Sequence, residues 1–354
     1  MHEIIIQDME ELAQRPGLAL EKLRGSTVLV AGGNSMLGKY LAWLFCFLNE
    51  RKGFGITLYV LVRNLEKAKT SYQEWADRDY FYFLHQDICE PIGLKNMRPP
   101  EKVDFIFHVA GSASASFIAR DPVGIIRANT LGTTNMLEFA RQTKAQVVFA
   151  STREVYGKLP ESITRIKEDD MGVLDPIHPR NSYPESKKMA EALLVSYEKQ
   201  YGVAYTLLRI AHAYGPGMEI NNDGRVMADF IGAVVHKQDI VLNSDGSACR
   251  SFCYITDCID GILRAALCSS AQKMFNLANE TEPQMIRDVA QSLIGTFPEL
   301  DLKVKFSTEA GGIHQGGYNP IPMVSLDTTR IESIGWKPLV RLQEGMKRTV
   351  LSFW

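Results

Sequence analysis

Apolar and polar positions alternate in blocks along the first two thirds of the chain. Five short apolar runs are rich in β-branched and aromatic residues, which is typical of strands. They cover residues 27–33, 55–64, 81–88, 103–111 and 145–151. Longer stretches at 39–49 and 132–143 predict helices between them. Because strands separated by helices form a parallel sheet with helices on both faces, the pattern predicts an α/β, Rossmann-like doubly wound fold.

The alternation of strands and helices becomes less regular in the last third of the chain. Before this change, residues 147–150 are apolar without alternation, as a strand covered on both faces should be. After the run at 205–217, glycine, proline and polar loops become more frequent. We therefore expect a helical extension over residues 1–24, a Rossmann-like domain over 25–214, and a smaller α/β substrate lobe over 215–354 that is partly interleaved with the first.

Composition and charge exclude several classes of protein. The 354 residues are 45% hydrophobic and 23% charged, with a formal net charge of −2, so no basic excess suggests a nucleic-acid partner. The longest apolar stretch, residues 40–48, is too short to cross a bilayer, and the N-terminus lacks the pattern of a secretion signal. We expect a cytoplasmic protein that does not contact membranes.

Three of the six cysteines lie close together in the sequence. The spacing of Cys249, Cys253 and Cys258 matches no common zinc pattern, and no histidine stands near. Free cysteine prefers burial, so we expect structural thiols and no metal.

The first predicted strand runs into a glycine-containing turn, "AGGNSMLG". Gly32 and Gly38 hold the outer positions of a Gly-x-x-Gly-x-x-Gly pattern whose middle position is Ser35. Such a turn lets the backbone approach a pyrophosphate at the N-terminus of the following helix, although a plain tight turn is the alternative. The residues expected to hold a dinucleotide here are Gly32, Asn34, Ser35, Met36, Leu37 and Gly38.

The second strand ends at Arg63, where NAD-binding proteins usually carry an acidic residue. A guanidinium suits a 2′-phosphate, so the sequence slightly favours NADP over NAD, and a solvated arginine is the alternative. Asp87 and Ile88 would flank the adenine. Further residues expected along the dinucleotide are His108, Ala110, Gly111 and Asn129.

Tyr183 and Lys187 are four residues apart in "YPESK", and so lie on one helical face. An ammonium near a phenol favours the phenolate and lowers its pKa. A tyrosine tuned in this way can take a hydroxyl proton while hydride leaves the same carbon for a nicotinamide. The pair therefore predicts oxidation of an alcohol.

At this point the chain resembles the extended short-chain dehydrogenase/reductase family, in particular its members that modify nucleotide-linked sugars. The resemblance runs over nearly the whole chain, through "HVAG", "STREVYG", "YPESK", "YGPG", "NDGRV" and "RSFCYITD". It implies that Thr152 hydrogen-bonds the reacting hydroxyl, that Tyr183 is the acid/base, and that Lys187 supports it. It also implies a UDP-, dTDP-, GDP- or CDP-linked sugar in the second lobe, with Arg225 and Arg250 on its diphosphate and nucleoside.

The same resemblance implies a homodimer through a bundle of the helices at 132–142 and 183–200. It also gives Glu154 a task. Once the sugar's C4 hydroxyl has become a ketone, the hydrogen on C5 is acidic, and Glu154 matches the glutamate with which 4,6-dehydratases of the family remove it. The alternative is that Glu154 pairs with its neighbour Arg153 on the surface.

Arg153 departs from the family's pattern, because a guanidinium cannot donate the proton that many dehydratases supply at C6. It could clamp the C6 carboxylate of a uronic acid, but a tight ion pair would retard loss of that carboxylate as CO₂. Local sequences look most like UDP-glucuronate decarboxylases, yet their catalytic arginine falls on Met323 here, and the family's asparagine before "YGP" is His212. Other expected substrate contacts are Ser112 and Arg180, of which Arg180 is either a helix-end residue or a carboxylate contact.

The sequence thus favours a lyase that performs 4,6-dehydration or uronate decarboxylation through a 4-keto intermediate. A 4-epimerase or C4 ketoreductase is the enzyme alternative. A non-catalytic protein that senses NAD(P) or a sugar nucleotide is less favoured, because Thr152, Tyr183 and Lys187 are all present.

Overall fold

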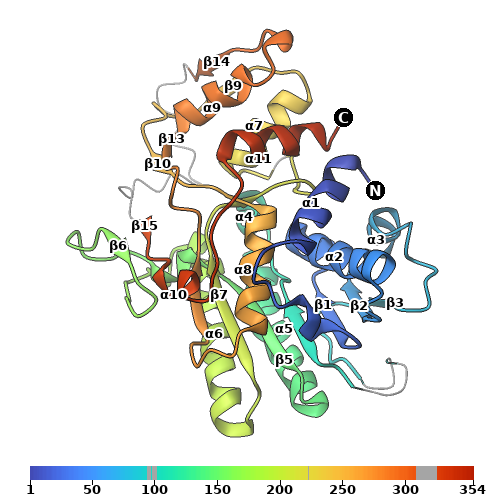
Figure 1. Cartoon of the computed structure of the whole chain (residues 1–354). Helices are drawn as coiled ribbons and strands as arrows, with labels where there is room; N and C mark the ends of the chain where they lie inside the picture. The colour runs from blue at the N-terminus through green and yellow to red at the C-terminus, as the bar shows by residue number, and fades with distance from the viewer. Residues whose placement is uncertain (94–96, 98–101, 222, 308–324) are drawn as a thin grey trace.

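A seven-stranded, wholly parallel sheet forms the centre of the molecule (Figure 1). The computed structural model describes residues 1–93, 97, 102–221, 223–307 and 325–354. In spatial order the strands are β12 (Met274–Leu277), β7 (Tyr205–Ile210), β5 (Gln146–Thr152), β4 (Phe105–His108), β1 (Thr27–Ala31), β2 (Thr57–Val62) and β3 (Phe81–His85). The predicted Rossmann-like α/β fold is confirmed.

Alternate residues of the strands serve two separate hydrophobic layers. In β1, Val28 and Val30 pack into the layer of α2 (Met36–Lys52) and α8 (Ile255–Leu267). Leu29 and Ala31 pack into the opposite layer, under α5 (Pro122–Thr143) and α6 (Ser182–Tyr201). Both faces are covered, which explains why the strands read as unbroken apolar runs.

The first sheet helix begins earlier than the sequence suggested. α2 starts at Met36 rather than near residue 39, because the Ser35 side chain caps it by accepting a hydrogen bond from the Gly38 backbone N–H. Helix α2 continues to Lys52, and Gly53, in the left-handed conformation, ends it.

A smaller group of elements lies beyond the carboxyl end of the sheet, in the upper part of Figure 1. It contains α7 (Val226–Val235), α9 (Ile286–Gly295), α11 (Leu342–Leu351) and the parallel pair β9 (Ile240–Leu242) and β14 (Val304–Phe306). The chain returns from this group to the sheet, since α8 packs against it and β12 pairs with β7.

The remaining helices and strands are short. They are α1 (Glu3–Ala13), α3 (Leu65–Ser71), α4 (Ala115–Arg120), α10 (Thr329–Ser333), β6 (Arg165–Ile166), β8 (Ala213–Tyr214), β10 (Cys249–Arg250), β11 (Cys253–Tyr254), β13 (Gln284–Met285) and β15 (Ser325–Leu326), with 3-10 turns η1 (Leu20–Leu23), η3 (Arg153–Tyr156), η4 (Pro179–Asn181) and η5 (Pro298–Leu300). Both chain ends lie near the smaller group of elements (Figure 1).

Helix α1 packs against α2 and α8 and carries a fully buried carboxylate. Asp8 accepts hydrogen bonds from Tyr40 and Tyr254, both at 2.7 Å, and from Arg348 at 3.0 Å. These partners come from α2, β11 and α11, so one side chain joins the N-terminal helix to both parts of the molecule.

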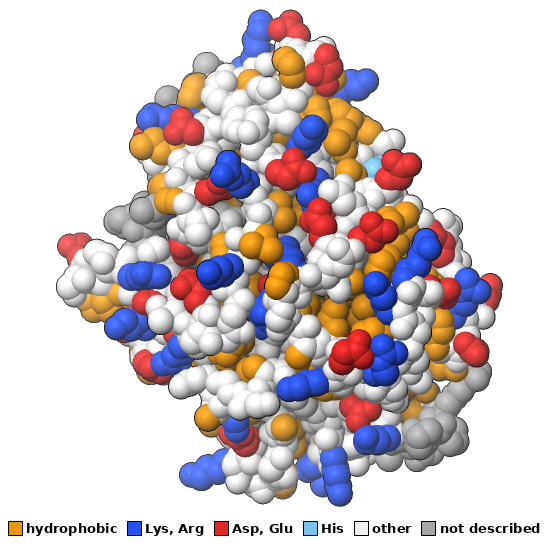
Figure 2. Space-filling model, in the orientation of Figure 1, with side chains coloured by type: hydrophobic (Ala, Val, Ile, Leu, Met, Phe, Trp, Pro, Cys, Tyr) orange, Lys and Arg blue, Asp and Glu red, His pale blue; other side chains and the backbone are white. Residues whose placement is uncertain are grey.

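The order of the strands fixes where a ligand can enter. The chain moves outward from β1 through β2 to β3, and then crosses to the other side of β1 to form β4. In open parallel sheets, ligands bind outside the carboxyl ends of the strands at this switch point. Lys and Arg side chains are interspersed with Asp and Glu over the visible face (Figure 2). None of the described helices is both long and apolar enough to span a membrane.

Candidate active site

One large cavity, of about 2490 Å³, opens at the switch point between the sheet and the smaller group of elements. It brings together most of the predicted site residues. Those that line it are Gly32, Asn34, Ser35, Met36, Leu37, Arg63, Asp87, Ile88, Ala110, Gly111, Ser112, Thr152, Arg153, Glu154, Arg180, Tyr183, Lys187, His212, Arg225 and Arg250. Met323 lies outside the described residues.

Three predicted cofactor contacts stand behind the cavity wall instead. His108 is fully buried, and its Nε2 lies 3.0 Å from the Thr133 hydroxyl under α5. Burial, helped by the charge of Lys187, lowers the pKa of His108 to about 3, so the ring is a neutral core residue that does not line the cavity where the dinucleotide was predicted to bind. Asn129 is buried behind Gly111, and Gly38 is buried at the start of α2. Both support the wall without lining it.

The glycine turn after β1 fits a pyrophosphate. Gly32 has φ +103°, and a Cβ there would stand 2.7 Å from the Ala110 backbone nitrogen, so the turn lies directly against the end of β4. A Cβ at Gly38 would collide with the Gly32 carbonyl oxygen. Ser35, in place of a middle glycine, closes the turn by donating to that same oxygen at 2.7 Å. The N-terminus of α2 therefore faces the cavity, and Gly32 brings bare backbone to the turn in front of it.

The outer end of the cavity carries an exposed arginine. The Arg63 side chain is 73% exposed and lies 3.9 Å from the Asp87 carboxylate. Asn34 donates to the Asn64 carbonyl at 2.8 Å, and its own side-chain oxygen is buried with no hydrogen-bond partner among the described residues. A dinucleotide's adenosine would find donors and an unused acceptor here.

Lys39 and Lys67 also line this end and were not selected from the sequence. Lys39 donates to the Gly217 carbonyl at 2.5 Å, and burial lowers its pKa to about 8. Lys67 forms an ion pair with Glu219 at 3.2 Å. Both contacts tie the helices after β1 and β2 to the loop that follows β8. The position of Lys39 directly after Gly38, the last glycine of the turn, could have identified Lys39 from the sequence.

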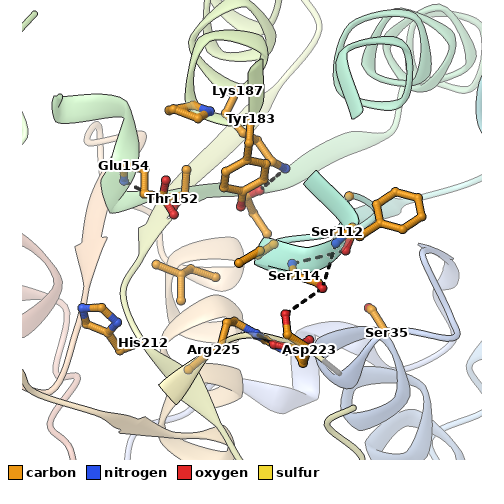
Figure 3. Close-up of a pocket in the computed structure, with 18 of the residues that line it drawn as sticks. Ser35, Ser112, Ser114, Thr152, Glu154, Tyr183, Lys187, His212, Asp223 and Arg225 are labelled. Carbon is orange, nitrogen blue, oxygen red and sulfur yellow. Dashed lines mark hydrogen bonds and ion pairs between the residues drawn. The ribbon is translucent and has the colours of Figure 1, made fainter. Parts of the chain in front are cut away.

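Thr152, Tyr183 and Lys187 converge at the other end of the cavity (Figure 3). Thr152 ends β5, and the other two side chains descend from the first turns of α6. The Lys187 ammonium donates to the Ala150 carbonyl at 2.8 Å and lies 4.5 Å from the centroid of the Phe149 ring. The Tyr183 phenol, the Thr152 hydroxyl and the Lys187 amine therefore lie on the same wall of the cavity.

The electrostatics of the phenol differ from the prediction. Burial raises the pKa of Tyr183, the carboxylate of Glu154 adds to this, and a hydrogen bond with Thr152 acts in the opposite direction. Lys187 is not among the largest contributors to this shift. Burial lowers the pKa of Lys187 itself to about 7, and its ammonium is directed at a carbonyl, so in the protein alone the Tyr183 pKa is raised and not lowered as predicted.

Glu154 pairs with Arg180 rather than with its neighbour Arg153. The Arg180 Nη2 atom lies 2.9 Å from Oε2 and 3.1 Å from Oε1 of Glu154. The two side chains are 37% and 30% exposed, so solvent screens their attraction and the pair contributes at most about 1 kcal/mol to stability. Its main effect is to fix the direction of the carboxylate.

The Arg153 side chain contacts His212. Its Nη1 atom lies 3.1 Å from Nε2 of His212, whose backbone is left-handed at φ 47°. Because an arginine can only donate, this nitrogen of His212 is the acceptor and the proton sits on Nδ1. The enclosing protein, with the charges of Arg153 and Arg250, lowers the pKa of His212 to about 3 even though its ring borders the cavity.

The floor of the cavity in Figure 3 carries a second ion pair. Arg225, at the start of α7, binds Asp223, whose side chain is almost fully buried, with Nη2 and Oδ2 3.0 Å apart. The Asp223 backbone oxygen accepts a hydrogen bond from Ser114 at 2.9 Å. Asp223 was missed as a site residue, although "NDGRV" was noticed for its arginine.

The three neighbouring cysteines are free thiols: Cys253 and Cys258 are buried and Cys249 is half-buried at the cavity. Within the described residues, no group of three or more His, Cys, Asp or Glu side chains is arranged to hold a metal ion.

Comparison with known families shows to which family this chain belongs. The model of the NAD dependent epimerase/dehydratase family matches residues 28–278, about seven tenths of the chain, from β1 to the end of β12. The chain belongs to this family. The resemblance predicted from the motifs is thereby confirmed, and the chain is an enzyme of the NAD-dependent epimerase/dehydratase type.

The curated relatives include several plant and animal enzymes. The UDP-glucuronic acid decarboxylase 5 of Arabidopsis thaliana is 30% identical over 321 residues, covering 90% of this chain and 86% of the relative. The UDP-glucuronic acid decarboxylase 1 of Xenopus tropicalis is 30% identical over 328 residues, covering 92% and 72%.

Solved structures share the fold at lower identity. A UDP-glucose 4-epimerase from Thermotoga maritima superposes with a TM-score of 0.74 at 22% identity, covering 92% of this chain and 98% of that one. A dTDP-glucose 4,6-dehydratase from Bacillus anthracis, in complex with NAD, gives 0.72 at 17% identity, covering 93% and 96%.

Proposed function

We propose that the protein oxidises the C4 hydroxyl of a nucleotide-activated sugar to a ketone and then acts at C5 and C6 of the 4-keto intermediate. The observation that supports this most is the placement of Thr152, Tyr183 and Lys187 in the same cavity as the glycine turn, with Glu154 beside Thr152. Among C5/C6 outcomes we favour decarboxylation of a nucleotide-linked uronic acid, because the relatives named above act on UDP-glucuronic acid.

The chain's own residues divide the first step between them. Thr152 orients the sugar hydroxyl, and Tyr183 removes its proton. When bound, the nicotinamide supplies the acceptor for the hydride that leaves C4. Lys187 stands behind both groups, next to Gly111, where its charge would favour a deprotonated phenol in the complex with substrate and cofactor.

The dinucleotide would occupy the β1–α2 side of the cavity. The turn at Gly32 and the N-terminus of α2 would hold its pyrophosphate, and Asp87 and Ile88 its adenine. Arg63 stands where NAD-binding proteins usually carry an acidic residue. It favours NADP over NAD, because a guanidinium binds a 2′-phosphate. Cofactor affinity measured for both dinucleotides by calorimetry tests this preference.

The nucleotide half of the substrate would bind the smaller lobe, which we take to extend from residue 215 onward. Arg225 and Arg250 line the cavity from this side and would neutralise the diphosphate. The base attached to it, whether uracil, thymine, guanine or cytosine, is left to the assay below.

We also propose a homodimer through α5 and α6. Large apolar side chains are exposed on both helices, and monomeric surfaces rarely carry such patches without a partner. They are Val123, Ile126 and Leu131 on α5, and Met189 and Val195 on α6. Sedimentation of the purified protein, compared with a variant carrying Leu131→Glu and Val195→Glu, tests the dimer.

A 4-epimerase that retains the carboxylate is the second candidate. Arg153 stands in the cavity one residue from Thr152 and cannot donate a proton to a leaving group. A carboxylate clamped by this guanidinium would resist leaving as CO₂.

The deciding experiment incubates the protein with UDP-glucuronate and, separately, with dTDP-, GDP- and CDP-hexoses, and follows product mass. Loss of CO₂ supports decarboxylation, loss of water supports dehydration, and an isomer of unchanged mass supports epimerisation. Net reduced cofactor in stoichiometric amount indicates a ketoreductase.

Tyr183→Phe should lower turnover roughly 10²–10⁴-fold while leaving the far-UV spectrum unchanged. Full activity in this variant would contradict the assignment. If no sugar in the panel reacts but one binds, a sensor of sugar nucleotides becomes the better explanation.

A further inference from the structure

The Glu154–Arg180 pair has an asymmetry that the oxidation step does not explain. A single guanidinium nitrogen, Nη2, contacts both carboxylate oxygens, at 2.9 and 3.1 Å. The other terminal nitrogen, Nη1, is buried and has no hydrogen-bond partner within the described part of the chain. Arg180 therefore holds Glu154 and keeps a donor in reserve at the edge of the cavity.

The backbone around Arg180 is fixed by its own short contacts. It lies in the 3-10 turn η4, where Pro179 restricts the backbone and the His178 ring accepts a hydrogen bond from the Arg180 N–H at 3.3 Å. Asn181 donates to the Asp175 carbonyl at 2.9 Å. Helix α6, with Tyr183 in its first turn, follows directly. One turn thus sets the positions of both Arg180 and the acid/base phenol.

Among the described residues, the other side of Glu154 is held through its backbone. The Glu154 N–H donates to the Thr152 hydroxyl at 3.3 Å, and the side chain of Arg153 leads away to His212. The direction of the Glu154 carboxylate is therefore set by Arg180, which is 26 residues away in sequence.

We propose that Arg180 is a positioning residue that holds the Glu154 carboxylate within reach of the substrate's C5. This rests on the proposed function. In the 4-keto sugar the C5–H bond breaks, its electron pair forms the enolate on the C4 oxygen, and the proton goes to a carboxylate oxygen of Glu154. The reverse step returns a proton from Glu154 to C5, and water exchanges with it. Nη2 orients the carboxylate. Because Nη1 has no hydrogen-bond partner among the described residues, the guanidinium can move together with the carboxylate when the sugar binds.

The test measures uptake of solvent deuterium at C5 of UDP-glucuronate and its product, together with KM and the absorbance of reduced cofactor. Arg180→Met should slow C5 deuteration about 10²-fold, the loss expected when a catalytic group is displaced by an ångström, with little change in KM. Reduced cofactor should accumulate, because oxidation at C4 continues while the C5 step is slow. Arg180→Lys, which keeps the charge but not the fork, should recover part of the rate.

A double variant decides whether Arg180 works through Glu154. Glu154→Gln with Arg180→Met should be no slower in C5 deuteration than Glu154→Gln alone. Arg78→Met is the matched control, since it breaks an arginine–glutamate pair of similar length, Nε of Arg78 to Oε1 of Glu50 at 3.1 Å, outside the cavity. It should leave every readout unchanged.

Two results would overturn the positioning role: multiplicative losses in the double variant, or a raised KM with unchanged C5 deuteration in Arg180→Met. A wild-type protein that never reduces its cofactor with any sugar would instead overturn the proposed function, and with it this inference. The cofactor signal therefore separates the two failures.

Discussion

Lys187 shows how burial shapes a single functional side chain. It is 3% exposed and donates to one carbonyl, and burial lowers its pKa from the ordinary 10.5 to about 7. Between these two values the unfolded chain holds a proton that the folded protein has released. Stability therefore rises with pH over that window, by the linkage between proton binding and folding.

We expect Lys187→Met to change this pH dependence. Below pH about 7 the wild type carries the full cost of a buried charge, so the variant should be the more stable protein, and its advantage should shrink as pH rises toward about 10. Urea unfolding of both proteins at several pH values measures the difference. Lys188→Met, one residue along and outside the cavity lining, is the control and should show no such trend. A difference that stays constant with pH would contradict the buried-charge explanation.

Sequence patterns identified individual site residues well when the residues were close in sequence. The Tyr183–Lys187 spacing correctly placed both side chains in one cavity with Thr152. The choice of partner for Glu154 could not be predicted, because Arg153 is adjacent and Arg180 is 26 residues away. The fold of the turn η4 brings Arg180 within hydrogen-bonding distance of Glu154.

The β1–α2 turn carries the largest constraint at the scale of one element. Gly32 combines a left-handed backbone with close contact to the Ala110 backbone, whereas Gly25, at φ +68°, has no atom within 4 Å of a Cβ position. A substitution at Gly25 therefore tests the cost of the left-handed backbone alone, whereas a substitution at Gly32 adds the cost of a steric collision.

Gly32→Ala should destabilise the fold by roughly 3 kcal/mol and abolish dinucleotide binding, because both the backbone and its neighbour must move. Gly25→Ala should cost about 1 kcal/mol, from the left-handed backbone alone, and should leave binding intact. Urea unfolding and calorimetry with NAD and NADP provide the two readouts. Equal effects of the two substitutions would show that contact with Ala110 is unimportant.

The first five strands of the sheet were predictable because each is an uninterrupted apolar run. The position of His108 behind the cavity wall follows from strand geometry. Side chains alternate along β4, with Phe107 in the α2 layer and Ile106 in the α5 layer, so His108 points toward α5 rather than upward into the cavity. Position at a strand's carboxyl end indicated a ligand contact, and the alternation could have corrected it.

At the scale of the whole molecule, Asp8 joins segments that no local pattern could pair. Tyr254 is 246 residues and Arg348 is 340 residues from it. The sequence predicted a helix at the N-terminus but gave no indication that it would be attached to the last helix of the chain. The return of β12 to the sheet is equally non-local, since it depends on pairing with β7.

Asp8→Ala should destabilise the protein by about 3 kcal/mol, because it leaves two buried tyrosine hydroxyls and part of the Arg348 guanidinium without their acceptor. Glu344→Ala is the control. It removes an exposed carboxylate, 2.8 Å from Nε of the same arginine, and should cost under about 1 kcal/mol. Thermal unfolding of the three proteins gives the comparison. If both variants lost the same small amount, Asp8 would not be the junction of the two parts.

The C5 chemistry is tested most directly by the mass of the nucleotide sugar recovered after turnover of UDP-glucuronate in deuterium oxide. We expect a product that has lost CO₂ and carries two solvent deuterium atoms at C5. One replaces the carboxylate when the enolate is protonated, and the other replaces the original C5 hydrogen that Glu154 exchanges with water. A decarboxylated product with a single deuterium at C5 would mean that the original C5 hydrogen is never removed and that Glu154 is not its base.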